Sequence, residues 1–132
     1  GLLLCWKIRQ GIKQNVEPDR IKKYLDWFWI SYLKPHFEIE EQYVFPILGK
    51  ENKLVKQALA EHRKLKRLFV NESDIQKSIS LIEEELEKHI RFEERVLFNE
   101  IQVVASSEQL LQIELDSSDK IFYENLSDPF WE

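Results

Sequence analysis

Two short patterns, each beginning at a histidine, contain the residues of this chain most able to do chemistry. His36 and His89 each begin the pattern H-x-x-x-E-E-x-x-x-F, which places Glu40 and Glu93 four residues after the imidazole. Residues four apart on an α-helix lie about 40° apart around its axis, so each histidine shares a helix face with its glutamate. The second glutamate of each pattern lies about 140° from the histidine and points sideways or outward.

Both histidine–glutamate pairs lie on apolar stripes rather than on charged faces. A buried carboxylate is costly unless positive charge compensates it, and a divalent or trivalent metal ion supplies more charge than any side chain. His62 adds a third imidazole on an apolar stripe. Three imidazoles and two carboxylates from three helices can hold two metal ions, with each carboxylate able to bridge them. The sequence therefore predicts a metal site of His36, Glu40, His62, His89 and Glu93.

Four amphipathic helices must position these side chains, since apolar residues recur every three or four positions along most of the chain. The predicted helices cover residues 2–14, about 18–48, 53–70 and 74–104. Their short connections favour an all-α fold, an antiparallel up-down-up-down four-helix bundle. A short fifth helix is predicted at about 106–115. We expect residues 116–132 to pack along the bundle or to contact another chain.

Helix boundaries follow from local signals. Pro18 suits the first turn of the second helix, and Pro35 inside that helix predicts a kink rather than an end. Gly49 is a candidate C-terminal cap, and residues 73–76 resemble a capping box before the fourth helix. The periodicity places the following residues inward besides the metal candidates: Leu4, Ile8, Ile12, Trp29, Leu33, Val44, Ile47, Val55, Leu59, Leu65, Phe69, Ile75, Ile79, Ile82, Leu86, Val96 and Glu100.

Length and composition limit the other possibilities. We expect 132 residues to form one domain over residues 1–132, with the bundle at about 1–104 and a C-terminal extension at about 105–132. Only 3 Gly and 4 Pro argue against an all-β protein, and the net charge of −5 argues against nucleic-acid binding. A lone cysteine, no signal peptide and no membrane-spanning apolar run predict a cytoplasmic protein without a membrane partner.

These motifs resemble the hemerythrin family, specifically the bacterial hemerythrin-like (HHE cation-binding) domains, over about residues 1–104. The residues that carry the resemblance are His36-Phe37-x-x-Glu40-Glu41 with Phe45-Pro46, Glu61-His62, and His89-x-x-x-Glu93-Glu94 with Leu97-Phe98. The resemblance implies a four-helix bundle with a non-haem di-iron centre, two iron ions joined by an oxo or hydroxo bridge. It also implies that the three histidines are terminal ligands and that Glu40 and Glu93 are bridging carboxylates. Manganese and zinc accept the same donors.

The chain departs from the family pattern in two places. The family takes a histidine from its first helix, and residues 1–15 contain none. Because the chain starts at Gly1 without a methionine, we expect that ligand upstream of Gly1. Cys5 is the alternative ligand, although a lone cysteine on an apolar stripe is more often a core residue. Lys66 stands four residues after His62, where the oxygen carriers have a second histidine. Its amine either reaches solvent or donates a hydrogen bond to a ligand at the centre.

Ferritin-like di-iron proteins are the nearest alternative among helical metal proteins. Their E-x-x-H signature requires a glutamate three residues before each histidine. Leucine occupies that place before all three histidines, at Leu33, Leu59 and Leu86. The sequence therefore favours the hemerythrin-like pattern.

Three functions remain open from the sequence. The first is a di-iron protein that binds or senses O2, NO or iron. The second is an enzyme that acts on peroxide, NO or ferrous iron at the same centre. The third is a metal-free helical interaction domain that docks a partner through residues 116–132. The oligomeric state is left open, with a homodimer as one option.

Overall fold

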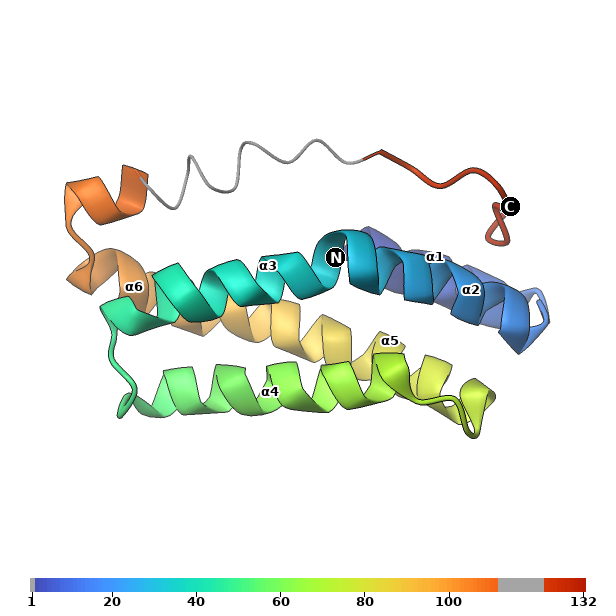
Figure 1. The fold of residues 1–132 in the computed structure, drawn as a ribbon, viewed down its shortest axis with the longest axis horizontal. Coiled ribbons are helices and arrows are strands. Elements are labelled where there is room, and N and C mark those ends of the chain that lie inside the picture. Colours follow the sequence, from blue (N-terminus) through green and yellow to red (C-terminus); the bar gives the residue numbers. More distant parts are fainter. Residues whose placement is uncertain (1, 112–122) are drawn as a thin grey trace.

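The computed structural model describes residues 2–111 and 123–132, and every regular element in these two ranges is helical (Figure 1). The elements are α1 (Leu2–Lys13), α2 (Pro18–Phe28), η1 (Trp29–Leu33), α3 (Lys34–Ile39), η2 (Glu40–Val44), η3 (Phe45–Ile47), α4 (Lys53–Val70), α5 (Ile75–Phe92), η4 (Glu93–Leu97) and α6 (Phe98–Val104). The elements η1, η2 and η4 are single π-helical turns, and η3 is a short 3-10 turn. Residues 107–111 are also helical, and the rest of the predicted fifth helix lies outside the described residues.

These elements join into four rods that form the predicted antiparallel bundle. The rods are α1, the continuous run from α2 to η3, α4, and the continuous run from α5 to α6 (Figure 1). Helix α4 packs on α5, and α1 packs on α5 as well. Helix α1 is shorter than the other rods, and Figure 1 shows the N-terminal end of the chain near the middle of the bundle.

The irregularity predicted at Pro35 takes the form of the π turn η1, which ends two residues before it. Pro35 has no N–H to donate, and its ring would collide with the carbonyl of Ser31 in a regular α-helix. A wider turn at residues 29–33 relieves this contact. The rod continues through the proline, so the prediction that Pro35 does not end the helix is confirmed.

Two further π turns shift the helical register after the predicted ligands. A π turn contains one residue more than an α turn, so the positions beyond it rotate relative to a 3.6-residue pattern. From the last residue of η4 onward the inward positions are Leu97 and Ile101, which are 0% and 2% exposed. The prediction that Val96 and Glu100 point inward was wrong, because Val96 is 41% exposed and Glu100 is exposed as well.

The other inward predictions hold with small exceptions. Ile12 was expected inward but is 44% exposed, because Gly11 takes the position one turn after Ile8. Ile47, Leu59 and Ile75 are half-buried, while the remaining predicted apolar positions are buried.

The helix ends follow the predicted signals in part. Pro18 stands in the first turn of α2, and Gly49 has a φ of 90°, the left-handed conformation expected of a C-terminal cap. The capping box predicted at residues 73–76 was wrong. Ser73 bonds to the Asn71 side chain instead, and Asp74 precedes α5 in a left-handed conformation without a side-chain cap.

The C-terminal residues 123–132 pack along α1 and α2, as the sequence predicted for part of the tail (Figure 1). Phe130 is 1% exposed and packs edge-on against Tyr24. Lys7 is buried and pairs with Glu124, which also accepts a hydrogen bond from Tyr24. The expectation for residues 116–122 falls outside the described residues.

The buried apolar residues form two clusters. The larger cluster includes buried residues of α1, α2 and the first half of α5, together with Phe130. The smaller cluster consists of Val44, Phe45, Val55, Ala58, Leu97 and Ile101. Buried polar side chains from the predicted site lie between these clusters along the rods. No helix in the described part of the chain is long and apolar enough to cross a membrane.

Candidate metal centre

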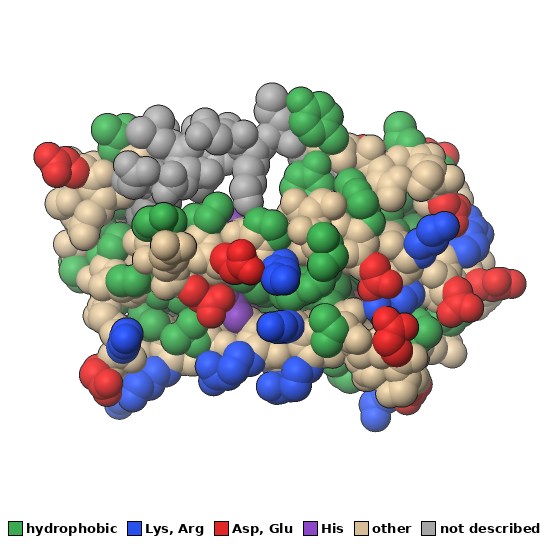
Figure 2. All heavy atoms as spheres, in the orientation of Figure 1, with side chains coloured by type: hydrophobic (Ala, Val, Ile, Leu, Met, Phe, Trp, Pro, Cys, Tyr) green, Lys and Arg blue, Asp and Glu red, His purple; other side chains and the backbone are tan. Residues whose placement is uncertain are grey.

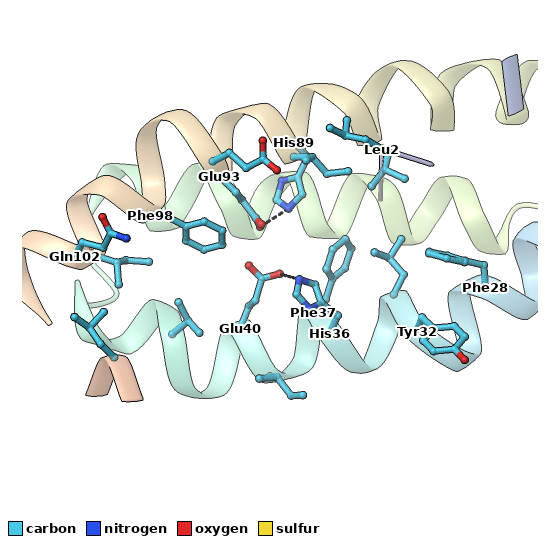
Figure 3. Close-up of a pocket in the computed structure, with 18 residues that line it drawn as sticks. Leu2, Phe28, Tyr32, His36, Phe37, Glu40, His89, Glu93, Phe98 and Gln102 are labelled. Atoms are coloured by element: carbon cyan, nitrogen blue, oxygen red, sulfur yellow. Dashed lines mark ion pairs between the residues drawn. The ribbon is translucent and has the colours of Figure 1, made fainter. Parts of the chain in front are cut away.

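The five predicted site residues come together at mid-length of the bundle. His36 and Glu40 come from α3 and the start of η2, and His89 and Glu93 come from α5 and the start of η4. Figure 3 shows Glu40 and Glu93 pointing toward each other from facing rods, each with its histidine beside it. His62 reaches the same place from α4. The matched repeat therefore builds two facing halves of one site.

A deep group of donor atoms consists of His62, His89 and Glu93, all buried, with donor atoms within 4.8 Å of one another. The two imidazoles face each other, with 3.1 Å between their Nε2 atoms. Glu93 Oε1 lies 2.6 Å from His89 Nε2 and 3.6 Å from His62 Nε2. One cation placed among these atoms would contact two nitrogens and an oxygen.

A shallower group consists of His36, Glu40 and Glu93, again with donor atoms within 4.8 Å of one another. His36 Nε2 lies 2.9 Å from Glu40 Oε1. The His36 side chain is 52% exposed, although its helix stripe predicted an inward position beside Glu40. Glu93 belongs to both groups, and Glu40 Oε1 is 3.9 Å from His62 Nε2, so the two groups adjoin each other.

Several buried polar atoms of this centre make no hydrogen bond of regular geometry, although imidazole nitrogens lie close to two of them. They are both carboxylate oxygens of Glu40, Glu93 Oε1 and His62 Nδ1. Buried polar atoms are rarely left unpaired in folded proteins, because each one loses its hydration without compensation. Metal ions bind carboxylate oxygens directly, so the donor set fits a cation between the two glutamates.

Without an ion, the pKa of each buried group in the centre depends on the groups beside it. Burial and the adjacent Glu93 carboxylate raise the pKa of Glu40 to about 10. Burial also disfavours the Glu93 charge, yet its contacts with His62 and His89 bring its pKa below the usual value. Burial disfavours a charged His89, but contacts with Glu61 and Glu93 raise its pKa to about 9. Protons thus supply part of the positive charge that two carboxylates attract at this place.

Comparison with known protein families agrees with this geometry. The family model for the hemerythrin HHE cation binding domain matches residues 5–71, just over half of the chain. The chain belongs to this family. The matched segment includes His36, Glu40 and His62 and ends before α5. Comparisons with curated proteins and with solved structures find no match.

Two outer carboxylates of this hemerythrin domain approach the imidazoles from behind, and neither was assigned a role at the site from its spacing. Glu61 Oε1 lies 2.7 Å from His89 Nδ1, and Glu41 Oε2 lies 3.5 Å from His62 Nδ1. Both glutamates belong to the motifs that indicated the family, Glu61 as the residue before His62 and Glu41 as the second glutamate of its pattern. In Figure 2 histidine atoms are visible between α3 and α4 with acidic side chains beside them.

A cavity of about 730 Å³ opens beside the shallow group of the hemerythrin domain (Figure 3). Its polar lining includes His36, Glu40, His89 and Glu93. Its apolar lining includes Leu2, Phe28, Leu33, Phe37, Leu86, Phe98 and Ile101. A small molecule in this cavity would meet the His36 side of the centre first.

The two alternative ligands considered from the sequence lie elsewhere. Cys5 is fully buried in the larger apolar cluster and is in neither group of candidate metal ligands found among the described residues. Burial raises the pKa of its thiol to about 11, which disfavours the thiolate that binds metals. Lys66 is exposed on α4, where Figure 2 shows a row of basic side chains, and it does not line the described cavity. Its amine therefore reaches solvent.

Proposed function

We propose that this hemerythrin domain holds two iron ions and uses them to bind or sense a small molecule such as O2 or NO. The observation that carries the proposal is the pair of buried glutamates, Glu40 and Glu93, whose unpaired oxygens face each other among three imidazoles. A helical protein that needed these rods only for packing would be more stable with apolar residues at both positions.

The two groups of donors suggest how the ligands divide. The deep ion would take His62, His89 and Glu93, and the shallow ion would take His36, Glu40 and Glu93. Iron at such a place supplies redox chemistry and an open coordination position. His62 and His89 are 3% and 1% exposed, and they keep water from the deep side. The shallow side has one imidazole and faces the cavity, so the exogenous ligand would bind there.

The enzymatic alternative, which acts on peroxide, NO or ferrous iron, gains no support from Lys66. A lysine beside an open metal position could deliver protons there, but Lys66 is exposed on α4 and does not line the cavity. The apolar lining of the cavity suits a ligand that is held and released. A further histidine ligand upstream of Gly1 stays a prediction, and Leu2 at the start of α1 lines the same cavity.

Metal analysis of protein grown with iron tests the proposal. We expect about two irons per chain, and His89→Ala and Glu93→Ala should lose most of them because each removes a donor of the deep group. Lys66→Ala is the matched control, one helical turn from His62 on α4, and should keep the wild-type content. Fewer than about 0.2 metal ions per wild-type chain would overturn the site and favour a metal-free interaction domain.

Optical spectra then separate binding from turnover. A binding or sensing protein should show a spectral change when the ferrous form meets O2 or NO, and the change should reverse when the gas is removed. An enzyme should instead consume many equivalents of peroxide or NO per centre. Sustained turnover without a reversible spectrum would favour the enzymatic alternative.

A further inference from the structure

We propose that Glu61 is a positioning residue that holds His89 in the orientation and tautomer needed to bind metal. The inference rests on the proposed function, because it concerns the deep group of donors. It assigns a role to a glutamate on α4 that would not touch the ion itself.

The geometry joins three side chains in a row across α4 and α5. Glu61 Oε1 lies 2.7 Å from His89 Nδ1, and Gln57 Nε2 donates a 3.0 Å hydrogen bond to Glu61 Oε2. The His89 side chain is 2% exposed and that of Glu61 is 25% exposed, so the contact is shielded on the histidine side. Glu61 is therefore held at one oxygen and presents the other to the imidazole.

The tautomer of His89 follows from this contact. A carboxylate only accepts hydrogen bonds, so the ring donates from Nδ1 to Glu61. Because the pKa of His89 is raised to about 9, Nε2 also carries a proton in the metal-free protein, and a metal ion has to displace that proton. The displacement leaves a lone pair on Nε2, the atom that faces His62 Nε2 at 3.1 Å and Glu93 Oε1 at 2.6 Å. A carboxylate behind a ligating histidine orients the ring and increases its basicity. His89 is thus directed at the ion before the ion arrives.

His62 provides a contrast within the same site. Its Nδ1 lies 3.5 Å from Glu41 Oε2 but has no hydrogen-bond partner, and the Glu41 side chain is 42% exposed. The support behind His62 is therefore looser than the support behind His89. We expect the deep ion to depend more on Glu61 than on Glu41.

The test compares Glu61→Ala and Glu61→Gln with a matched control. Glu85→Gln removes a carboxylate of similar exposure, 19%, which joins the same two helices through Lys64 at 3.0 Å and touches no candidate ligand. Fe(II) is titrated anaerobically against a chelator. We expect affinity to fall about 10–100-fold in Glu61→Ala, less in Glu61→Gln because the amide oxygen still accepts, and not at all in Glu85→Gln.

A second measurement needs no metal. At a pH above the His89 pKa of about 9 the ring is neutral, and its 15N signals in the metal-free protein report which nitrogen carries the proton. Both Glu61 variants should shift these signals, while Glu85→Gln should not. Unchanged ring signals with wild-type affinity would overturn the role of Glu61 and leave the metal site intact. An equal loss of affinity in Glu85→Gln would overturn it too, because the effect would then come from helix packing. A wild-type protein that takes up no iron would overturn the proposed function, and this inference with it.

Discussion

At the scale of single residues, the environment gives different properties to side chains of one type. His62 and His89 are almost fully buried, whereas the His36 side chain is half exposed. Glu40 and Glu93 are both buried, although the glutamates that follow them in sequence are exposed. The carboxylate pair therefore destabilises the metal-free fold, and protons offset only part of that cost.

Glu40→Gln should separate stability from metal binding. The amide keeps the shape of the side chain but removes the need to neutralise a second buried carboxylate. We expect the metal-free protein to gain about 1–3 kcal/mol in its free energy of unfolding, measured with urea. Iron should stabilise the wild type further and the variant much less.

The control for this substitution is Glu38→Gln, at an exposed position two residues earlier on the same rod. It should change the metal-free stability by less than about 0.5 kcal/mol. Equal effects of the two substitutions would contradict the idea that buried charge at Glu40 destabilises the metal-free fold.

The sequence could predict that these five side chains come together, because spacing and residue type restrict the candidates strongly. It could not predict that His36 is exposed, since spacing along one rod does not show what covers a side chain. Glu41 and Glu61 were assigned no position at the site, because residue spacing says which face a side chain occupies but not which atom it meets across a helix interface.

At the scale of elements, apolar periodicity located the helices to within one or two residues. The ends of α1 and α4 lie close to the predicted residues, because each helix extends as far as its apolar face and ends where that face is interrupted. The π turns could not be predicted in this way, since a periodicity of 3.6 residues per turn describes only regular α-helix. The error appeared at Val96 and Glu100, directly after the first residues of η4.

The contact between α1 and the C-terminal segment depends on a missing side chain. A Cβ on Gly11 would lie 2.8 Å from Phe130 and 2.9 Å from Ile21, too close for either neighbour to stay in place. Gly11→Ala should therefore destabilise the protein by about 1–3 kcal/mol, although alanine favours a helix by about 1 kcal/mol.

A double-mutant cycle with Phe130→Ala checks this reason. Phe130→Ala alone should cost about 3 kcal/mol, since it empties a buried site. In that background Gly11→Ala should cost much less or stabilise the protein, because the main obstruction is gone. Additive effects in urea unfolding would contradict direct contact between α1 and Phe130.

At the scale of the whole molecule, a polar layer divides the interior. The larger apolar cluster lies on the side that contains α1 and the C-terminal segment, and the smaller one lies beyond the glutamates. The smaller cluster contains six buried residues and has less apolar surface to hold its end of the rods together. Metal binding would connect the two halves through the layer that separates them.

Amide hydrogen exchange should reveal this division. In the metal-free protein we expect faster exchange in η2, the start of α4 and α6 than in α2 and the start of α5. Iron should slow exchange most at the first group, because its helices lead directly from the ligands. The His89→Ala variant treated with iron is the control and should exchange like the metal-free wild type. Uniform slowing along all rods would contradict the division.

The π turns η2 and η4 have a consequence for insertions and deletions. Each begins at one of the two inner glutamates, Glu40 and Glu93. A π turn accommodates one extra residue, so removing a residue from it would restore an ordinary α-helix. Leu97 and Ile101 would then take positions 96 and 100, which a regular 3.6-residue pattern places inward, and would stay in the interior. Removing a residue from a regular α-helical stretch would instead rotate everything beyond it by about 100°. The two π turns are therefore the places in these rods where the loss of one residue would disturb the packing least.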